Sequence, residues 1–347
     1  MAACLLGVTL LSGCTFDTLD VDRRSLVDVI TIDTDGAGGY AVTYGFSDLQ
    51  GGGASSGGGG AGTSQNGLTY VTRSAPTGSQ ALAQVENTLT AAAFYGAVRL
   101  VILGEDAIAK GAGEALLATS RLREIPQDAL VAAVRGRASS FVTIPSVSAR
   151  KPLYFAMKSK SLVDGAISGE RLFAMASNAT TTDLAVMLPM FAEDQGLARF
   201  AGASILAGGR QRAFLPDRAA RLVHPLVSTA PETISVPVPQ LAPNPLMFRA
   251  RRTYADVTTL ADGSVRINWH GDGRLDEMET LSAQGHSDQM IETALAKAIM
   301  EDLTGAIGAL LQAGVDPRQI AGRPTPEVAQ RVHVIVNVHL DHGITGP

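Results

Sequence analysis

The stretch that decides the fold class is Val98-Arg-Leu-Val-Ile-Leu-Gly-Glu-Asp-Ala-Ile-Ala-Lys-Gly111. Residues 98–103 are rich in Val, Leu and Ile and predict a buried strand, which Gly104 ends. Acidic residues follow at once, where the first turn of a helix favours them, so we expect a helix over 105–119. Residues 129–135 form a second apolar run. Strand, helix and strand in this order are typical of a mixed α/β fold with parallel pairing.

The residues before this stretch predict a hairpin and three further elements. β-Rich residues over 26–32 and 40–46 predict two strands joined by a turn that begins at Asp33. The turn resembles the start of a calcium loop, but its twelfth position is Tyr44, where such a loop needs a bidentate Glu. We therefore expect a hairpin turn. A flexible glycine-rich loop, a third strand and a helix are expected over 51–60, 69–72 and 79–94.

The N-terminal segment ends in Leu11-Ser-Gly-Cys14, directly after an apolar run. An aliphatic residue, two small residues and a cysteine form the bacterial lipobox. In it the cysteine thiol receives a diacylglyceryl group, and a peptidase cuts just before that residue. We therefore expect residues 1–13 to be a signal peptide and Cys14 to be the lipidation site. The run is too short to span a bilayer, which takes about 20 residues. The alternative is a buried N-terminal strand.

The middle of the chain has a weaker hydrophobic pattern. Apolar residues at helical spacing predict a helix over 183–191, interrupted by Pro189. Strands are expected over 200–206 and 213–215, and short helices over 162–164, 170–176 and 216–222. Five prolines over 231–245 predict an interdomain connector or an edge strand with little regular pairing. We therefore expect an N-terminal α/β domain, a middle domain, a connector and a C-terminal domain, over 14–145, 146–230, 231–245 and 246–347.

The C-terminal residues predict a strand meander, one long helix and a final strand. The strands of the meander are expected over 247–257, 264–269 and 271–281. Ser287 is a good N-cap, and Ile or Leu then recurs every fourth residue, which predicts an amphipathic helix ending near Leu311. Residues 331–340 alternate as a strand does. One face of that strand holds Arg331, His333, Ile335, Asn337 and His339, and the other holds valines and Leu340.

Composition and motif spacing exclude several classes of function. The 347 residues carry a formal net charge of -5 at pH 7, and no basic run exceeds Arg249-Ala-Arg251-Arg252, so nucleic acid is not an expected partner. No Gly-x-Ser-x-Gly elbow lies between a predicted strand and a predicted helix, so we expect no enzyme. Two clusters of His and acidic residues lack an established metal-ligand spacing, so no metal is expected. They are His270, Asp272, Asp276 and Glu277, and His339, Asp341 and His342.

A series of motifs follows one order along the chain. They are the lipobox Leu11–Cys14, the Asp-Arg-Arg motif of Asp22, Arg23 and Arg24, Ile32-Asp33 before the hairpin, the strand and helix start over 99–111, Arg121–Ile125, Phe200–Ile205, the helix over 291–311 and the strand over 332–343. This order resembles the Ger(x)C family of spore germination lipoproteins, the C subunits of nutrient germinant receptors. The resemblance covers nearly the whole chain.

The resemblance implies a function in spore germination. It implies a lipoprotein that Cys14 anchors to the outer face of the spore inner membrane, beside integral-membrane and permease-like A and B subunits. No catalytic residue and no cofactor is implied. The motif of Asp22, Arg23 and Arg24 is a candidate interface, with a solvated turn as an equal alternative. The length of 347 residues leaves room for two or three small sheet-and-helix domains, so we expect a mixed α/β or α+β fold.

Two other classes of function remain open from the sequence. A free-standing solute-binding lipoprotein would have two lobes that close on a polar cleft, and its ligand would raise the melting temperature. A lipid-anchored hydrolase is the third class, but no nucleophile can be named for it.

Overall fold

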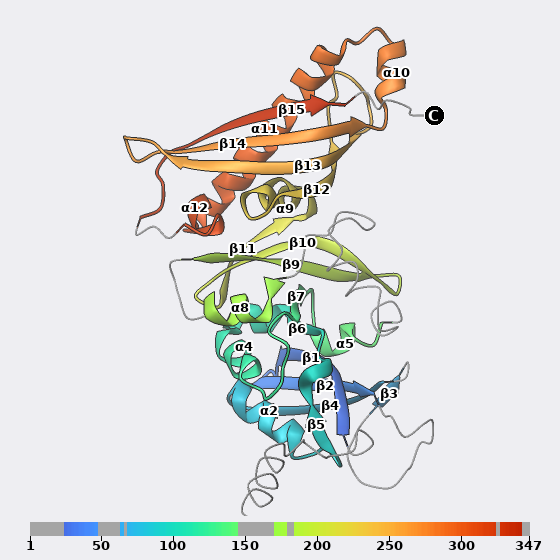
Figure 1. The fold of residues 1–347 in the computed structure, drawn as a ribbon, viewed down its shortest axis with the longest axis vertical. Coiled ribbons are helices and arrows are strands. Elements are labelled where there is room, and N and C mark those ends of the chain that lie inside the picture. The colour runs from blue at the N-terminus through green and yellow to red at the C-terminus, as the bar shows by residue number, and fades with distance from the viewer. Residues whose placement is uncertain are drawn as a thin grey trace, which may run out of the picture.

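The computed structural model describes residues 24–47, 63–65, 68–144, 170–178, 184–323 and 327–341. The described strands form one sheet of 11 strands and one of 4 strands. Figure 1 shows the N-terminal strands at one end of the long axis and the smaller sheet at the other. This combination of sheets and helices confirms the predicted mixed α+β class. The expected signal peptide, Cys14, and the loop and helix expected over 51–60 and 162–164 lie outside the described residues.

The centre of the larger sheet is β6 (Leu100–Gly104). It pairs in parallel with β1 (Arg24–Thr34) on one side and with β7 (Leu130–Val134) on the other. Every residue of β6 and of β7 is buried, as expected for parallel strands covered on both faces. The parallel pairing predicted from the order strand, helix and strand is confirmed.

β1 also forms the predicted hairpin with β2 (Tyr40–Ser47), which pairs in turn with β4 (Leu68–Ala75). The Asp35 carboxylate accepts hydrogen bonds from the backbone N–H groups of Ala37 and Gly39, at 2.8 and 2.7 Å. An Asp that bonds to its own turn in this way stabilises the chain reversal. The hairpin interpretation is confirmed, and Asp35 serves that turn.

The helix predicted over 79–94 is wrong in its second half. α2 (Gly78–Glu86) ends early, and β5 (Ala92–Phe94) follows it and pairs in parallel with the start of β1. Leu89 is only partly buried, whereas Val85 is fully buried, so the apolar stripe loses its support near the end of α2. Pairing with β1 gives the backbone of β5 an alternative set of hydrogen bonds.

The helix predicted over 105–119 consists of two helices, α3 (Glu105–Lys110) and α4 (Gly113–Ser120). Gly111 separates them with a φ of 116°, a value that residues with a side chain rarely adopt. The Tyr40 hydroxyl donates a hydrogen bond to the Gly111 carbonyl at 2.6 Å, so the break is fixed against the hairpin.

Three antiparallel strands extend the larger sheet beyond β7: β9 (Ala185–Asp194), β10 (Leu197–Ala207) and β11 (Arg210–Pro216). The interrupted helix predicted over 183–191 is therefore wrong. Residues 185–191 are all buried, and a strand covered on both faces lacks the alternation that would distinguish it from a helix. Pro189 is tolerated because β9 pairs with β7 only at Met190 and Phe191.

The smaller sheet is an antiparallel meander completed by a parallel strand. Its strands in spatial order are β12 (Ala230–Val236), β13 (Leu246–Thr259), β14 (Val265–Leu275) and β15 (Val332–Leu340). The long helix α11 (Asp288–Gln312) connects β14 to β15 and packs on the sheet (Figure 1). The Ser287 side chain accepts a hydrogen bond from the Met290 N–H at 3.3 Å, which confirms the predicted N-cap.

The two strands predicted over 264–269 and 271–281 are a single strand, β14, followed by α10 (Met278–Ala283). Gly271 lies inside β14, and a glycine is required there because the Trp269 ring covers the position. A Cβ at this position would come within 2.7 Å of the indole. The glycine therefore marks a close approach of a side chain and not a turn.

The remaining described elements are short. They are β3 (Thr63–Gln65), η2 (Tyr95–Ala97), α5 (Ala138–Phe141), β8 (Glu170–Arg171), α8 (Leu172–Asn178), α9 (Asp217–Val223), η3 (His224–Leu226) and α12 (Pro317–Ile320). α8 and α9 agree with the helices predicted over 170–176 and 216–222. Within the described ranges, no helix combines the length and the apolar character needed to cross a bilayer.

One hydrophobic cluster joins the two sheets. It contains Ile205 of β10, Leu222 of α9, Trp269 of β14, and Ile299 and Leu303 of α11. The Trp269 indole N–H donates a hydrogen bond to the Leu222 carbonyl at 3.1 Å, which attaches β14 to α9. Because α9 also packs on β10, it connects the larger sheet to the smaller one.

Candidate functional site

Arg24 is the member of the Asp-Arg-Arg motif that the structure describes, and Asp22 and Arg23 lie outside the described residues. As the first residue of β1, Arg24 borders an open pocket of about 500 Å³. We call this the Arg24 pocket. Its lining residues are Arg24, Glu86, Asn87, Leu89, Thr90, Ala91, Ala92, Ala93, Tyr95, Arg123 and Glu124.

The walls of the Arg24 pocket carry charges of both signs. Arg24 lies opposite Ala92 in the parallel pairing of β1 and β5, and its guanidinium carbon is 5.2 Å from the centre of the Phe94 ring. Such a cation–π contact orients the guanidinium. Arg123 and Glu124 lie across the pocket as an exposed pair, 3.6 Å apart. Glu124 has a φ of 62°, a strained conformation for a residue with a side chain.

Two tyrosines lie beneath the charged rim of the pocket. The Tyr95 hydroxyl hydrogen-bonds to the Glu86 carboxylate and lies 3.3 Å from the Tyr44 hydroxyl. The two rings meet edge to face, 5.7 Å apart at an interplanar angle of 83°. Burial raises the pKa of both hydroxyls, so both phenols stay neutral at ordinary pH. Tyr95 holds Glu86 in place by donating a hydrogen bond to its carboxylate, and Tyr44 contacts Tyr95.

The chemistry of the Arg24 pocket suits binding. None of its lining side chains is a Ser, a Cys or a His, the groups of the common nucleophile and base pairs. Arg24 and Arg123 can bind carboxylates, and Glu86 can bind cations. The sequence motif identified Arg24, but it could not identify Glu86 or Arg123, because the chain brings them to β1 from distant segments.

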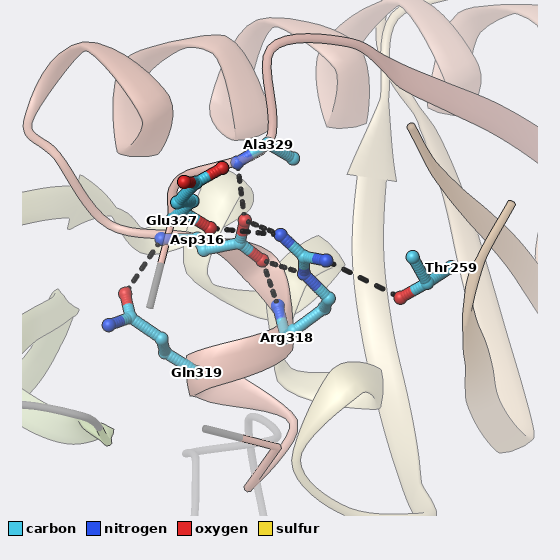
Figure 2. Close-up of polar contacts among 6 residues, drawn as sticks. All are labelled: Thr259, Asp316, Arg318, Gln319, Glu327 and Ala329. Atoms are coloured by element: carbon cyan, nitrogen blue, oxygen red, sulfur yellow. Dashed lines mark hydrogen bonds and ion pairs between the residues drawn. The ribbon is translucent and has the colours of Figure 1, made fainter. Parts of the chain in front are cut away.

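Asp316 and Arg318 form a second polar centre at the start of α12 (Figure 2). Asp316 is fully buried and receives two hydrogen bonds from the Arg318 guanidinium, at 2.9 and 2.8 Å. It also accepts one from the Ala329 N–H at 2.6 Å, and the Gln319 side chain completes a capping box. Arg318 in turn donates to the Glu327 carbonyl at 3.0 Å. The centre therefore links α12 to the chain that enters β15.

The ionisation of Asp316 follows from these partners. Burial alone would raise the pKa of the carboxyl, but the hydrogen bonds from Arg318 and Ala329 outweigh it, so the pKa lies below its ordinary value. A neighbouring pocket of about 500 Å³ contains Arg318 and Glu327 in its wall. Since the polar atoms of Asp316 are already used, we interpret this centre as structural.

The first predicted cluster of His and acidic residues is dispersed by other contacts. The His270 ring stacks on Tyr254, with 4.6 Å between centroids and an interplanar angle of 9°. Asp276 pairs with Arg249 at 2.7 Å. Within the parts of the chain that the structure describes, no three His, Cys, Asp or Glu side chains are grouped closely enough to hold a metal ion.

The second cluster is divided in the same way. The His339 Nδ1 atom lies 3.4 Å from the Glu292 carboxylate, and Asp341 forms an ion pair with Arg251. His342 lies outside the described residues. These contacts connect β15 to α11 and β13.

His224 has a different place from the one expected. Its position before Pro225 predicts a loop residue, but the structure buries it in η3, with its Nδ1 atom 2.6 Å from the Glu232 carboxylate. Glu232, on β12, is also buried and lies 3.7 Å from the guanidinium of Arg221. In the sequence, Arg221 and His224 are one helical turn apart, which indicates that their side chains lie close together. Their shared partner, Glu232, could not be identified because it comes from the proline-rich segment.

A comparison with protein families identifies the chain. The profile of the spore germination protein N-terminal domain matches residues 17–192, which is just over half of the 347 residues. The chain therefore belongs to the Ger(x)C family of spore germination proteins, as the order of its motifs predicts.

The fold is similar to that seen in the crystal structure of the GerBC protein. The TM-score is 0.50 at 12% sequence identity, and the alignment covers 90% of this chain and 96% of that one. The likeness therefore extends through both sheets. The search of curated proteins gave no match.

Proposed function

We propose that the chain is the C subunit of a nutrient germinant receptor. It is a non-catalytic lipoprotein on the outer face of the spore inner membrane, and it contacts integral-membrane and permease-like A and B subunits. The family match over residues 17–192 is the observation that carries this proposal. The mixed charges of the Arg24 pocket, which suit contacts with proteins, agree with it.

The anchor in this proposal is Cys14, with the Leu11–Cys14 lipobox as its support. Two or three acyl chains bind a bilayer far more firmly than one chain, which gives only reversible attachment. The ten residues from Cys14 to Arg24 span at most about 35 Å when fully extended. Arg24 therefore stays within that distance of the lipid anchor, where membrane subunits can reach it, and we propose Asp22, Arg23 and Arg24 as the interface.

Fractionation of spores tests the anchor. Cys14→Ala is expected to move the chain from the inner-membrane fraction to the soluble fraction, because no thiol is left for the lipid. Cys4→Ala, ten residues upstream, is the matched control and is expected to leave the chain in the membrane. A Cys14→Ala chain that stays fully membrane-bound would contradict lipid anchoring.

Purification of the chain from detergent-solubilised spore membranes tests the partners. We expect two membrane subunits to copurify in constant ratio, and spores that lack the chain to lose the response to at least one nutrient. A chain that copurifies with neither subunit, but whose melting temperature rises with a small solute, would favour the solute-binding class instead.

A further inference from the structure

β15 is an edge strand that lacks the usual protection against association. Among the described strands it pairs only with β14, in a register that runs without a bulge from Val332 to Leu340. It is nine residues long and contains neither proline nor lysine. Natural sheets protect such edges with charges, prolines, bulges or covering elements, because an open edge accepts a further strand.

The opposite edge of the same sheet shows this protection. β12 contains Pro231, and Pro237 and Pro239 follow directly after it. Its pairing with β13 has a register shift between Ala230 and Glu232, and α9 packs against it. The two edges therefore differ, and only β12 is protected by prolines and a bulge.

Both faces of β15 leave apolar surface exposed near the edge. The inward side chains of Val334, Val336 and Val338 pack against the cluster beneath α11 but are only partly buried. On the outward face, Ile335 is 43% exposed. Side chains of a further strand paired with β15 would pack beside the three valines on one face and beside Ile335 on the other.

The backbone shows which residues would bond to that strand. The Asp341 N–H donates to the Gly273 carbonyl at 2.7 Å, and the Arg331 carbonyl accepts from Val265 at 3.0 Å. The backbone N–H and C=O groups of the odd-numbered residues of β15 therefore bond to β14. In a parallel pair the alternate residues then point away from it, toward the open edge. At the end of the strand the Leu340 N–H is already bonded to Glu292, at 2.7 Å.

The sequence of β15 is close to a palindrome, Val-His-Val-Ile-Val-Asn-Val-His-Leu, with Val336 at its centre. In a twofold interface each residue meets its mirror position in the other copy. About Val336, valine meets valine and His333 meets His339, while Ile335 meets Asn337. The backbone N–H and C=O groups of Val336 point toward the open edge. The two copies of Val336 can therefore form a hydrogen-bonded pair on the axis.

We propose that two copies of this chain associate through antiparallel pairing of β15 with β15, with the twofold axis at Val336. The two smaller sheets then form one continuous sheet of eight strands. Such an interface is small, so the dimer in solution is weak. Attachment to one membrane raises the effective concentration of the copies, which favours the same contact without new interactions.

Disulfide trapping tests the register directly. The full chain with Cys4→Ser and Cys14→Ser has no other cysteine. Adding Val336→Cys places two thiols on the axis, in a pair whose Cα atoms lie about 5.5 Å apart, which a disulfide can bridge. We expect a covalent dimer on mild oxidation. Val334→Cys is the matched control, because it faces Val338 and not itself, so it should form a dimer only when mixed with Val338→Cys.

Sedimentation of the same cysteine-free chain tests the association without a cross-link. We expect the mass to rise with concentration from 36.0 kDa toward twice that value. Ile335→Lys should raise the dissociation constant at least about tenfold, since a charge on an edge strand opposes pairing. Leu197→Lys replaces another exposed side chain, on the larger sheet, and should change nothing. Circular dichroism melting checks that both variants fold.

Three results would overturn the proposal. They are a monomer at every concentration, a Val334→Cys chain that cross-links with itself as readily as Val336→Cys, and equal loss of association in Leu197→Lys and Ile335→Lys. Since lipidation is absent from both experiments, their failure leaves the receptor function untouched.

Discussion

At the scale of single residues, two buried carboxylates hold distant parts of the chain together. Asp33 is 3% exposed and accepts hydrogen bonds from the backbone N–H groups of Ala138 and Ser139, at 2.7 and 2.9 Å. A Cβ at Gly104 would lie 2.2 Å from the same carboxylate, so the glycine makes room for it. Asp316 has the corresponding role in the C-terminal part.

Asp316→Asn is expected to lower the free energy of unfolding by about 2–4 kcal/mol at pH 7, because it leaves Arg318 without its charged partner. The folded pKa of Asp316 is depressed. Its contribution is therefore complete above the unfolded value near 4 and disappears as the pH falls through the folded pKa. Urea unfolding at pH 7 and pH 3 should show the wild-type advantage shrinking with acid.

The control for this prediction is Asp262→Asn, a carboxylate at an exposed turn that bonds to Ser264. Its pKa is also lowered, by the Ser264 hydrogen bonds, but the carboxylate is exposed and screened by solvent, so the variant should lose much less stability than Asp316→Asn. Equal losses in the two variants, or a difference independent of pH, would show that the charge of Asp316 does not stabilise the fold.

A second residue-scale prediction concerns Arg24. If the Arg24 pocket is an interface, Arg24→Ala should reduce copurification of the membrane subunits at least about tenfold, since hydrogen-bonded charges at interfaces contribute about 1.4 kcal/mol or more. The melting temperature should change little. Arg212→Ala, an exposed arginine on β11, is the control. Equal copurification with both variants would show that Arg24, which lies in β1 and not in a solvated turn, is not part of the interface.

At the scale of elements, the sequence predicted correctly the helices and strands that have one buried and one exposed face. α11 and β15 are half covered, so their 3.6-residue and two-residue periods are visible in the sequence. β9 was mistaken for a helix because both of its faces are buried. β14 was divided at Gly271, a residue that usually marks a turn, but here the glycine makes room for the ring of Trp269, two residues earlier in the same strand.

Adjacent positions on α11 provide an element-scale prediction. Ile299 is fully buried in the cluster that joins the sheets, whereas Met300 is 37% exposed. Ile299→Ala should destabilise the chain by about 2–5 kcal/mol through lost burial and a residual cavity. Met300→Ala should cost less than about 1 kcal/mol. Chemical denaturation measures both. A similar cost for the two would mean that α11 does not pack on the sheet by the observed face.

At the scale of the whole molecule, the sequence predicted the fold class and the family, but the way the parts join depended on contacts it could not show. The Arg221, His224 and Glu232 cluster lies between α9 and β12, and its members come from a helix and a proline-rich strand. The Arg24 pocket likewise combines segments about 60 and 100 residues from Arg24. The local periodicity of the sequence carries no information about contacts between such distant segments.

The shared core predicts that the two sheets unfold together. Trp269 is the single tryptophan of the chain, is fully buried in the smaller sheet, and is bonded to α9, which packs on the larger one. Its fluorescence therefore reports on the joint between the sheets, while far-ultraviolet circular dichroism reports on all strands and helices. In a two-state transition the two signals coincide.

Ile102→Ala makes this test specific, because Ile102 is fully buried in β6 and belongs to a cluster separate from that of Trp269. If the sheets are coupled, the variant should shift the Trp269 transition as far as the circular dichroism transition, by about 2–5 kcal/mol in unfolding free energy. If the sheets unfold independently, the fluorescence midpoint should stay at its wild-type value while the dichroism transition splits in two. Coupling would give the chain a rigid path between the Arg24 pocket and the β15 edge, because neither site could loosen without the core between them.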